Sequence, residues 1–160
     1  MKSAVFRICG GLGIAAMASA ALAGGHGDGN PAVKARQSHM TLYGHNLGVL
    51  GNMARGNIEY DAGAAQAAAD NLVLLSQVSQ RGYWAPETSN ADLGDETRLL
   101  PALFEEGGFA RAQEIGAQLS EAAVALAAVA GEGQAAIGPA LGPVGQSCGT
   151  CHEAFRQPNN

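Results

Sequence analysis

The chain has 160 residues, nine of them basic and fourteen acidic, and this length suits a single domain. The basic residues form no cluster, which argues against nucleic acid as a partner. Only three cysteines are present. Two of them, Cys148 and Cys151, are so close in sequence that a disulfide between them would close too small a loop to stabilise the fold much. We therefore expect these two thiols to serve chemistry.

The first 23 residues, MKSAVFRICGGLGIAAMASAALA, have the layout of a secretory signal peptide. Two basic residues precede an apolar run of small residues, and Ala21-Leu22-Ala23 forms a small-residue cleavage site. Cleavage after Ala23 leaves seven basic and fourteen acidic residues, a net charge of about −7 with neutral histidines. The apolar run is short for a membrane span, so an uncleaved anchor is the alternative and no other segment could cross a bilayer. We expect an exported protein without stable membrane insertion after cleavage.

Residues 24–30 (GGHGDGN) are predicted to be a flexible leader. Asn30 followed by Pro31 is typical of a helix start, with asparagine as the N-cap. The predicted helix runs from about residue 31 to 55. Its glycines each cost about 1 kcal/mol relative to alanine, which indicates a bulky group or a second helix against its backbone. The inward stripe is predicted as Val33, Gln37, Met40, Gly44, Leu47, Gly51 and Ala54.

Three more helices are predicted, at about residues 61–80, 97–130 and 134–157, and no strand pattern appears. A long loop follows Gly82, and its Trp84 is expected to pack over the bundle end. The third helix is predicted to be interrupted near Pro101 and Gly107. Pro139 and Pro143 indicate that the last helix either starts near residue 139 or bends before Cys148. Four amphipathic helices predict an all-α fold, an antiparallel four-helix bundle formed by residues 31–160.

The last helix carries the segment QSCGTCHEAFR, residues 146–156. At about 100° per residue, Cys148, Cys151 and His152 leave the same helix face. A redox dithiol is expected at a helix N-terminus after a strand, and structural zinc usually needs four ligands. Covalent haem attachment uses two thiols that add to the porphyrin vinyl groups and the adjacent histidine as axial iron ligand. We interpret the segment as the site of one haem c, with zinc and the dithiol as alternatives.

The chain resembles the cytochrome c′ family of four-helix c-type cytochromes. The resemblance is carried by VKARQSHMTLYGHNLGVLGNMARG near the start and VGQSCGTCHEAFR near the end, and it covers essentially the whole mature chain. It implies that His152 is the proximal iron ligand and that Arg36 and Gln37 contact the haem propionates. It also implies a periplasmic location, redox partner proteins, and homodimers through the first two helices.

The same resemblance places Met40 opposite His152. In the low-spin c-556 type a methionine there binds iron, which gives an electron carrier. In cytochromes c′ proper the position is open and binds nitric oxide or carbon monoxide. We expect Met40 to be the axial ligand, with the open gas-binding site as the alternative. His39 is predicted to point away from this site. No acid–base pair is evident beside Met40, so no enzymatic activity is expected.

Overall fold

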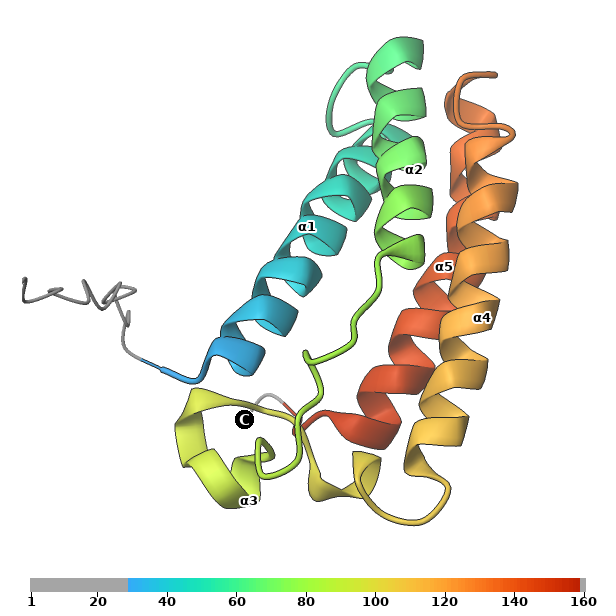
Figure 1. The fold of residues 1–160 in the computed structure, drawn as a ribbon. Helices are drawn as coiled ribbons and strands as arrows, with labels where there is room; N and C mark the ends of the chain where they lie inside the picture. Colours follow the sequence, from blue (N-terminus) through green and yellow to red (C-terminus); the bar gives the residue numbers. More distant parts are fainter. Residues whose placement is uncertain (1–28, 159–160) are drawn as a thin grey trace, which may run out of the picture.

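Four long helices form an antiparallel bundle in the computed structural model, which describes residues 29–158 (Figure 1). The predicted signal peptide, residues 1–23, and residues 24–28 of the predicted leader lie outside this part. The bundle helices are packed in a ring, α1 beside α2, α2 beside α4, α4 beside α5 and α5 beside α1. They are α1 (Pro31–Ala54), α2 (Ala62–Gln77), α4 (Gly108–Ala127) and α5 (Gln134–Phe155).

Local capping explains where the first two helices begin. The Asn30 side chain accepts a hydrogen bond from the Ala32 amide at 2.9 Å, and Pro31 occupies the first helical position. Asp61 caps α2 in the same way, accepting from the Ala64 amide at 2.6 Å. These caps satisfy amides that have no partner inside the helix. The predicted start of the first helix is therefore confirmed.

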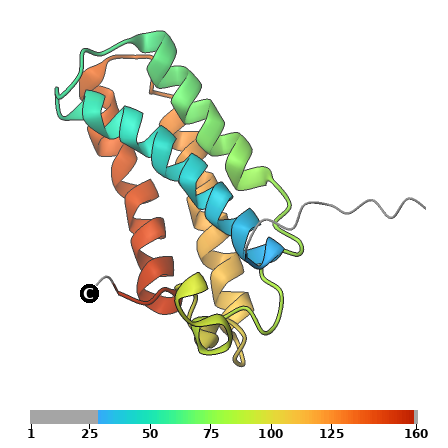
Figure 2. The same ribbon diagram turned by 90° about the vertical axis from the view of Figure 1, so that its left-hand side faces the viewer.

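Helices α1 and α5 separate toward the end of the bundle where α1 begins and α5 ends (Figures 1 and 2). The rest of the bundle is closed by one large apolar cluster drawn from all four helices. A smaller cluster lies at the end where the two helices separate, around Leu99, Leu103, Ile115 and Phe155. The half-buried Cys151 packs against it.

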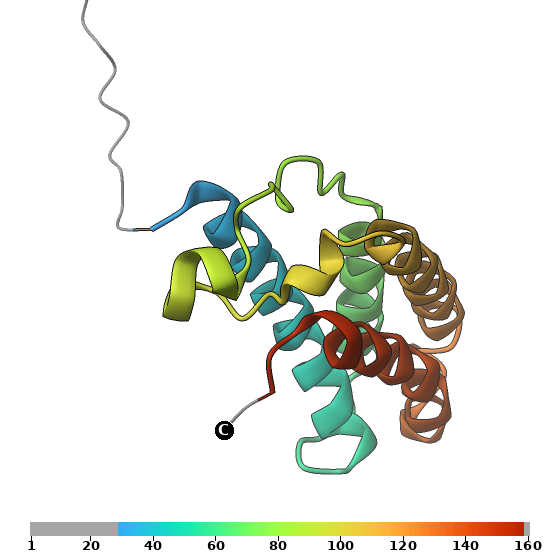
Figure 3. The same ribbon diagram turned by 90° about the horizontal axis from the view of Figure 1, so that it is seen from below.

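The segment between α2 and α4 differs from both predictions made for it, the long loop after Gly82 and a third helix that begins near residue 97. It contains three short helical pieces, α3 (Asn90–Leu93), η1 (Gly94–Glu96) and η2 (Pro101–Leu103). A capping box starts α3, with the Ser89 hydroxyl and amide both donating to the Asp92 carboxylate. The segment crosses the end of the bundle below α1 and α5 (Figure 3). Trp84 packs against the smaller cluster at this end, as predicted.

Helix α5 runs from Gln134 through Pro139 and Pro143 to Phe155, so the predicted start near residue 139 is wrong. Both prolines are exposed, so water can satisfy the carbonyl groups that their missing amides leave unpaired. No helix in residues 29–158 is long and apolar enough to span a bilayer.

Gly108 is expected to tolerate no side chain. A Cβ at this position would meet the Leu103 carbonyl oxygen at 2.5 Å and the Ala102 carbonyl oxygen closer still. We expect Gly108→Ala to lower the free energy of unfolding by about 1–3 kcal/mol, the usual cost of overpacking. Chemical denaturation measures this change.

Gly116, in the same helix, is the matched control because a Cβ there meets nothing within 4 Å. Gly116→Ala should stabilise by about 0.5–1 kcal/mol through helix propensity alone. Equal effects of the two substitutions would contradict the steric account.

Candidate haem-binding site

The inward face of α5 presents the two cysteines as predicted. Ile137, Val144 and Phe155 on that face are buried, and Cys148 and Cys151 are half-buried free thiols. Burial raises the pKa of both thiols, so each is protonated at neutral pH. A protonated thiol supplies both the sulfur and the hydrogen that add across a vinyl group.

His152 is exposed beside the cysteines. An Arg156 guanidinium nitrogen lies 3.5 Å from its Nδ1, so Nε2 is the ring nitrogen suited to binding iron. Partial burial, and then the charges of Arg156 and Arg98, lower the pKa of His152. The neutral imidazole that a metal requires is therefore favoured.

Helix α1 is rotated relative to the predicted stripe, by about the 100° that one residue contributes. Gln37, Met40 and Gly44 are exposed, and the buried face carries several polar residues instead. Asn46 is one of these polar residues, and it accepts a hydrogen bond from Asn71 of α2 at 3.0 Å. The buried residues of α1 are Val33, Arg36, His39, Tyr43, Asn46, Leu50, Gly51 and Met53.

Met40 is 38% exposed and is not a core residue. Two turns later on the same side of α1, Leu47 packs against the large apolar cluster. One turn beyond Met40, a Cβ built on Gly44 would meet nothing within 4 Å. The bulky neighbour predicted at this glycine is thus absent among the described residues, and the neighbour at Gly51 is the Arg55 side chain.

His39 is 5% exposed and therefore lies in the interior of the protein. Its ring packs edge-on against Tyr43 at 5.0 Å and Tyr83 at 5.9 Å between centroids. Its Nε2 is buried without a hydrogen-bond partner among the described residues. Burial lowers the pKa of His39, so the ring is held neutral in this apolar setting.

Arg36 lies inside the protein rather than at the bundle edge. Its side chain is 4% exposed, and its guanidinium donates to oxygens of Tyr83, Thr88 and Thr97. Gln37 donates to the Glu96 carbonyl at 3.0 Å. The propionate contacts of Arg36 and Gln37 stay a prediction. No sequence signal pointed to Thr88 and Thr97 as partners.

The donor set of the two helices fits a haem c. Helix α5 offers two thiols and an imidazole, and α1 offers the incompletely covered thioether of Met40. Tyr43 of α1 is electrostatically coupled to Cys148 of α5, because a charge on the Cys148 thiol raises the pKa of the Tyr43 hydroxyl. Within residues 29–158, no group of three His, Cys, Asp or Glu side chains could hold a bare metal ion.

Tyr43 provides a pH-dependent prediction. Burial, and then the charge of Cys148, raise the pKa of Tyr43 to about 12, against about 10 for an unfolded chain. The folded state therefore keeps this proton longer. Its stabilising effect is complete below pH 10 and is lost as the pH rises toward 12. We expect wild type to lose about 2–3 kcal/mol more than Tyr43→Phe over this range in denaturation experiments.

A thioether in place of the Cys148 thiol carries no charge, so the haem-loaded protein should show the burial contribution alone. Identical pH profiles for wild type and Tyr43→Phe would contradict the burial of this hydroxyl.

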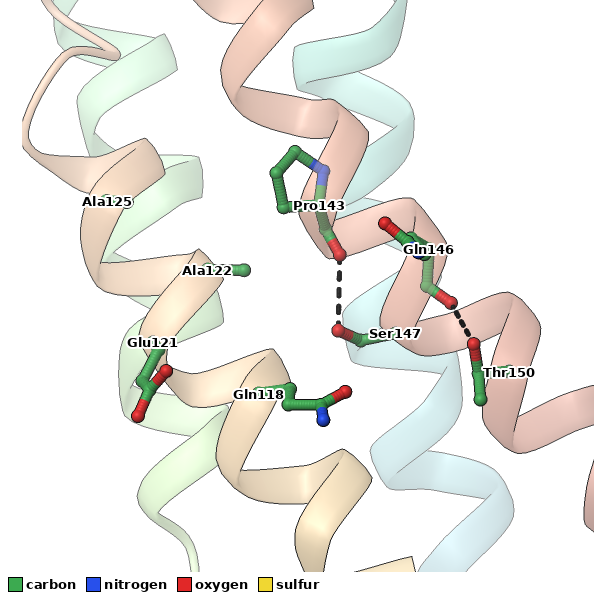
Figure 4. A pocket seen from close by; sticks show the side chains of 8 residues that line it. All are labelled: Gln118, Glu121, Ala122, Ala125, Pro143, Gln146, Ser147 and Thr150. Carbon is green, nitrogen blue, oxygen red and sulfur yellow. Dashed lines mark hydrogen bonds between the residues drawn. The ribbon is translucent and has the colours of Figure 1, made fainter.

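A hollow of about 390 Å³ lies elsewhere, between α4 and α5 (Figure 4). Its lining includes Ser147 and Thr150, the sequence neighbours of the two cysteines, but neither cysteine and not His152. Both hydroxyls donate to carbonyls of their own helix. This hollow is therefore separate from the haem-binding face.

The chain is similar to proteins of one known family. The sequence profile of the family described as cytochrome c′ matches residues 31–156. The cytochrome c′ of Cereibacter sphaeroides is 36% identical over 143 residues, which cover 89% of this chain and 92% of that protein. The solved cytochrome c′ from Rhodobacter spheriodes is 35% identical with a TM-score of 0.75, over 80% of this chain and 96% of that one.

A second solved structure is of a cytochrome c′ with ligand-controlled dimer dissociation. It is 28% identical with a TM-score of 0.68, and the match covers 79% of this chain and 95% of that chain.

Proposed function

Because the chain belongs to the cytochrome c′ family, we propose that it is a periplasmic carrier of single electrons with His152 and Met40 as the two axial ligands. The chain is a monohaem c-type cytochrome, and Cys148 and Cys151 have the spacing that attaches haem c covalently. When bound, the haem supplies one-electron chemistry between Fe(III) and Fe(II).

The observation that carries the proposal is the exposure of Met40. The residues on the buried face of α1 are covered by protein. Met40 is a large apolar side chain outside this face, and it is 38% exposed. A thioether is a good iron ligand that favours the reduced state. Two ligands that stay bonded in both oxidation states would keep the rearrangement at each electron transfer small, and the packed bundle would hold them.

A second function is favoured by the solved relative with ligand-controlled dimer dissociation. If Met40 stays unbonded, the position opposite His152 is open to nitric oxide or carbon monoxide. The open space beside Gly44 would then be room for such a ligand.

Visible spectra of the purified protein, oxidised and reduced, with and without carbon monoxide, separate the two functions. Low-spin bands that persist under carbon monoxide are expected for His152/Met40 ligation. A high-spin spectrum and rapid gas binding would instead support the open site and refute electron transfer through a bonded Met40.

We also propose that the protein forms homodimers through α1 and α2 and exchanges electrons with partner proteins. Two exposed large apolar side chains support the dimer, Leu42 of α1 and Leu74 of α2. The solved cytochrome c′ with ligand-controlled dimer dissociation supports a dimer, without indicating which helices form it. Analytical ultracentrifugation that finds only monomer across micromolar concentrations would refute it.

A further inference from the structure

The residues that would contact the haem come from two helices that separate at this end of the bundle. Met40 belongs to α1, and Cys148, Cys151 and His152 belong to α5. Their spacing therefore depends on whatever ties the beginning of α1 to the end of α5. In Figure 3 the segment of residues 83–100 spans this gap.

The segment is hydrogen-bonded to the last residues of α5. The Leu100 amide donates to the Phe155 carbonyl at 2.8 Å, and the Gln157 amide donates to the Arg98 carbonyl at 2.8 Å. The Asn90 side chain also donates to the Gln157 side chain at 3.1 Å. The segment is thus fixed within a few residues of His152.

The same segment is tied to α1 mainly by Arg36. One guanidinium nitrogen donates to the Tyr83 carbonyl at 3.2 Å and the Thr88 hydroxyl at 2.9 Å. The other donates to the Thr88 carbonyl at 2.6 Å and the Thr97 hydroxyl at 2.7 Å. The guanidinium carbon also lies 5.6 Å from the centre of the Trp84 ring. These contacts occupy a side chain that is almost fully buried, one turn before Met40.

We propose that Arg36 is a positioning residue that clamps residues 83–97 between α1 and α5 and thereby sets the distance of Met40 from His152. This role is distinct from the propionate contact that the family resemblance implies for Arg36. Its effect on the iron rests on the proposed axial ligation, whereas the clamp itself does not.

The guanidinium is suited to this role because it presents several donors in one rigid plane. A lysine keeps the charge but cannot reach four oxygens in different directions. Hydrogen bonds from a charged group are also about twice as strong as neutral ones. Loss of one such bond should therefore raise the opening of the segment about tenfold or more.

The clamp is tested by variants on both of its sides. The two threonine hydroxyls also bond the Ala85 carbonyl and the Leu99 amide, so Arg36→Lys is the more specific of the two changes. Arg36→Lys alters the donor, and the double change Thr88→Val with Thr97→Val removes two acceptors without touching α1. Arg81→Lys and Thr41→Val serve as controls, because both residues are exposed and lie outside the clamp. Thr97→Val alone covers the case in which the double variant does not fold.

Hydrogen exchange at the amides of residues 83–97 is the first readout on the haem-loaded protein. We expect about tenfold faster exchange there in Arg36→Lys and in the threonine variants, and no change in the controls. Unchanged exchange in both kinds of variant would overturn the clamp. Because exchange does not depend on the axial ligands, a high-spin wild type would refute the proposed function and leave this test intact.

Carbon monoxide binding to the reduced protein and the reduction potential are the second readouts. Both Arg36→Lys and the threonine changes should speed carbon monoxide binding, because Met40 is then held less firmly near the iron. A potential that shifts in Arg36→Lys, with no effect of the threonine changes on any readout, would show that Arg36 serves a haem carboxylate and would overturn the proposal.

Discussion

Replacing both Cys148 and Cys151 with alanine is expected to abolish covalent haem attachment, while either single change should leave one thioether. The two thiols are the only cysteines after residue 23, and both lie on the inward face of α5. No other side chain can supply a thioether bond to a vinyl group. Haem retained on the polypeptide after denaturation, measured by haem staining and intact mass, reports the result.

Cys9→Ala is the matched control for the thiol count, since this cysteine lies in the predicted signal peptide. It should leave attachment unchanged. Covalently bound haem in the Cys148→Ala/Cys151→Ala double variant would contradict the assigned attachment site.

Replacing Met40 with alanine is expected to convert a low-spin protein into a high-spin one that binds carbon monoxide. The change removes the thioether while leaving His152 in place. Because His/Met ligation favours reduced iron, the reduction potential should fall, by on the order of 0.1 V within the ~0.8 V range that axial ligands cover. Optical spectra, carbon monoxide titration and potentiometry measure the three effects.

His39→Phe separates this prediction from ligation by the neighbouring histidine. His39 is buried with an unpartnered Nε2, and its loss should leave the low-spin spectrum intact if Met40 is the ligand. A high-spin spectrum in His39→Phe together with a low-spin one in Met40→Ala would reverse the assignment.

The buried face of the last helix could be predicted from the sequence, whereas the buried face of the first helix could not. In α5 the inward positions are apolar residues and cysteines, so their periodicity follows the buried face. In α1 the buried face includes Arg36, His39 and Asn46. Periodicity treats such residues as exposed, and the groups that make their burial tolerable, such as Thr88 and Asn71, lie far away in the chain.

The candidate site shows the same contrast between local sequence signals and distant contacts. The positions of Cys148, Cys151 and His152 on one helix face could be predicted from their spacing in the sequence. The structure places all three near the C-terminal end of α5. The role of Arg36 depends on a segment some fifty residues later, whose short helical pieces are set by turns and caps. That segment has no apolar periodicity of its own, so its path across the bundle end was not predictable.

The central claim, that Met40 and His152 both bind the iron, is tested most directly by X-ray absorption at the iron edge of the oxidised and reduced protein. We expect scattering from one sulfur neighbour at bonding distance in both states, in addition to nitrogen neighbours. The cysteine sulfurs do not contribute, because they are bonded to the porphyrin periphery. Iron with nitrogen neighbours and no bonded sulfur would contradict the claim and leave the position opposite His152 open.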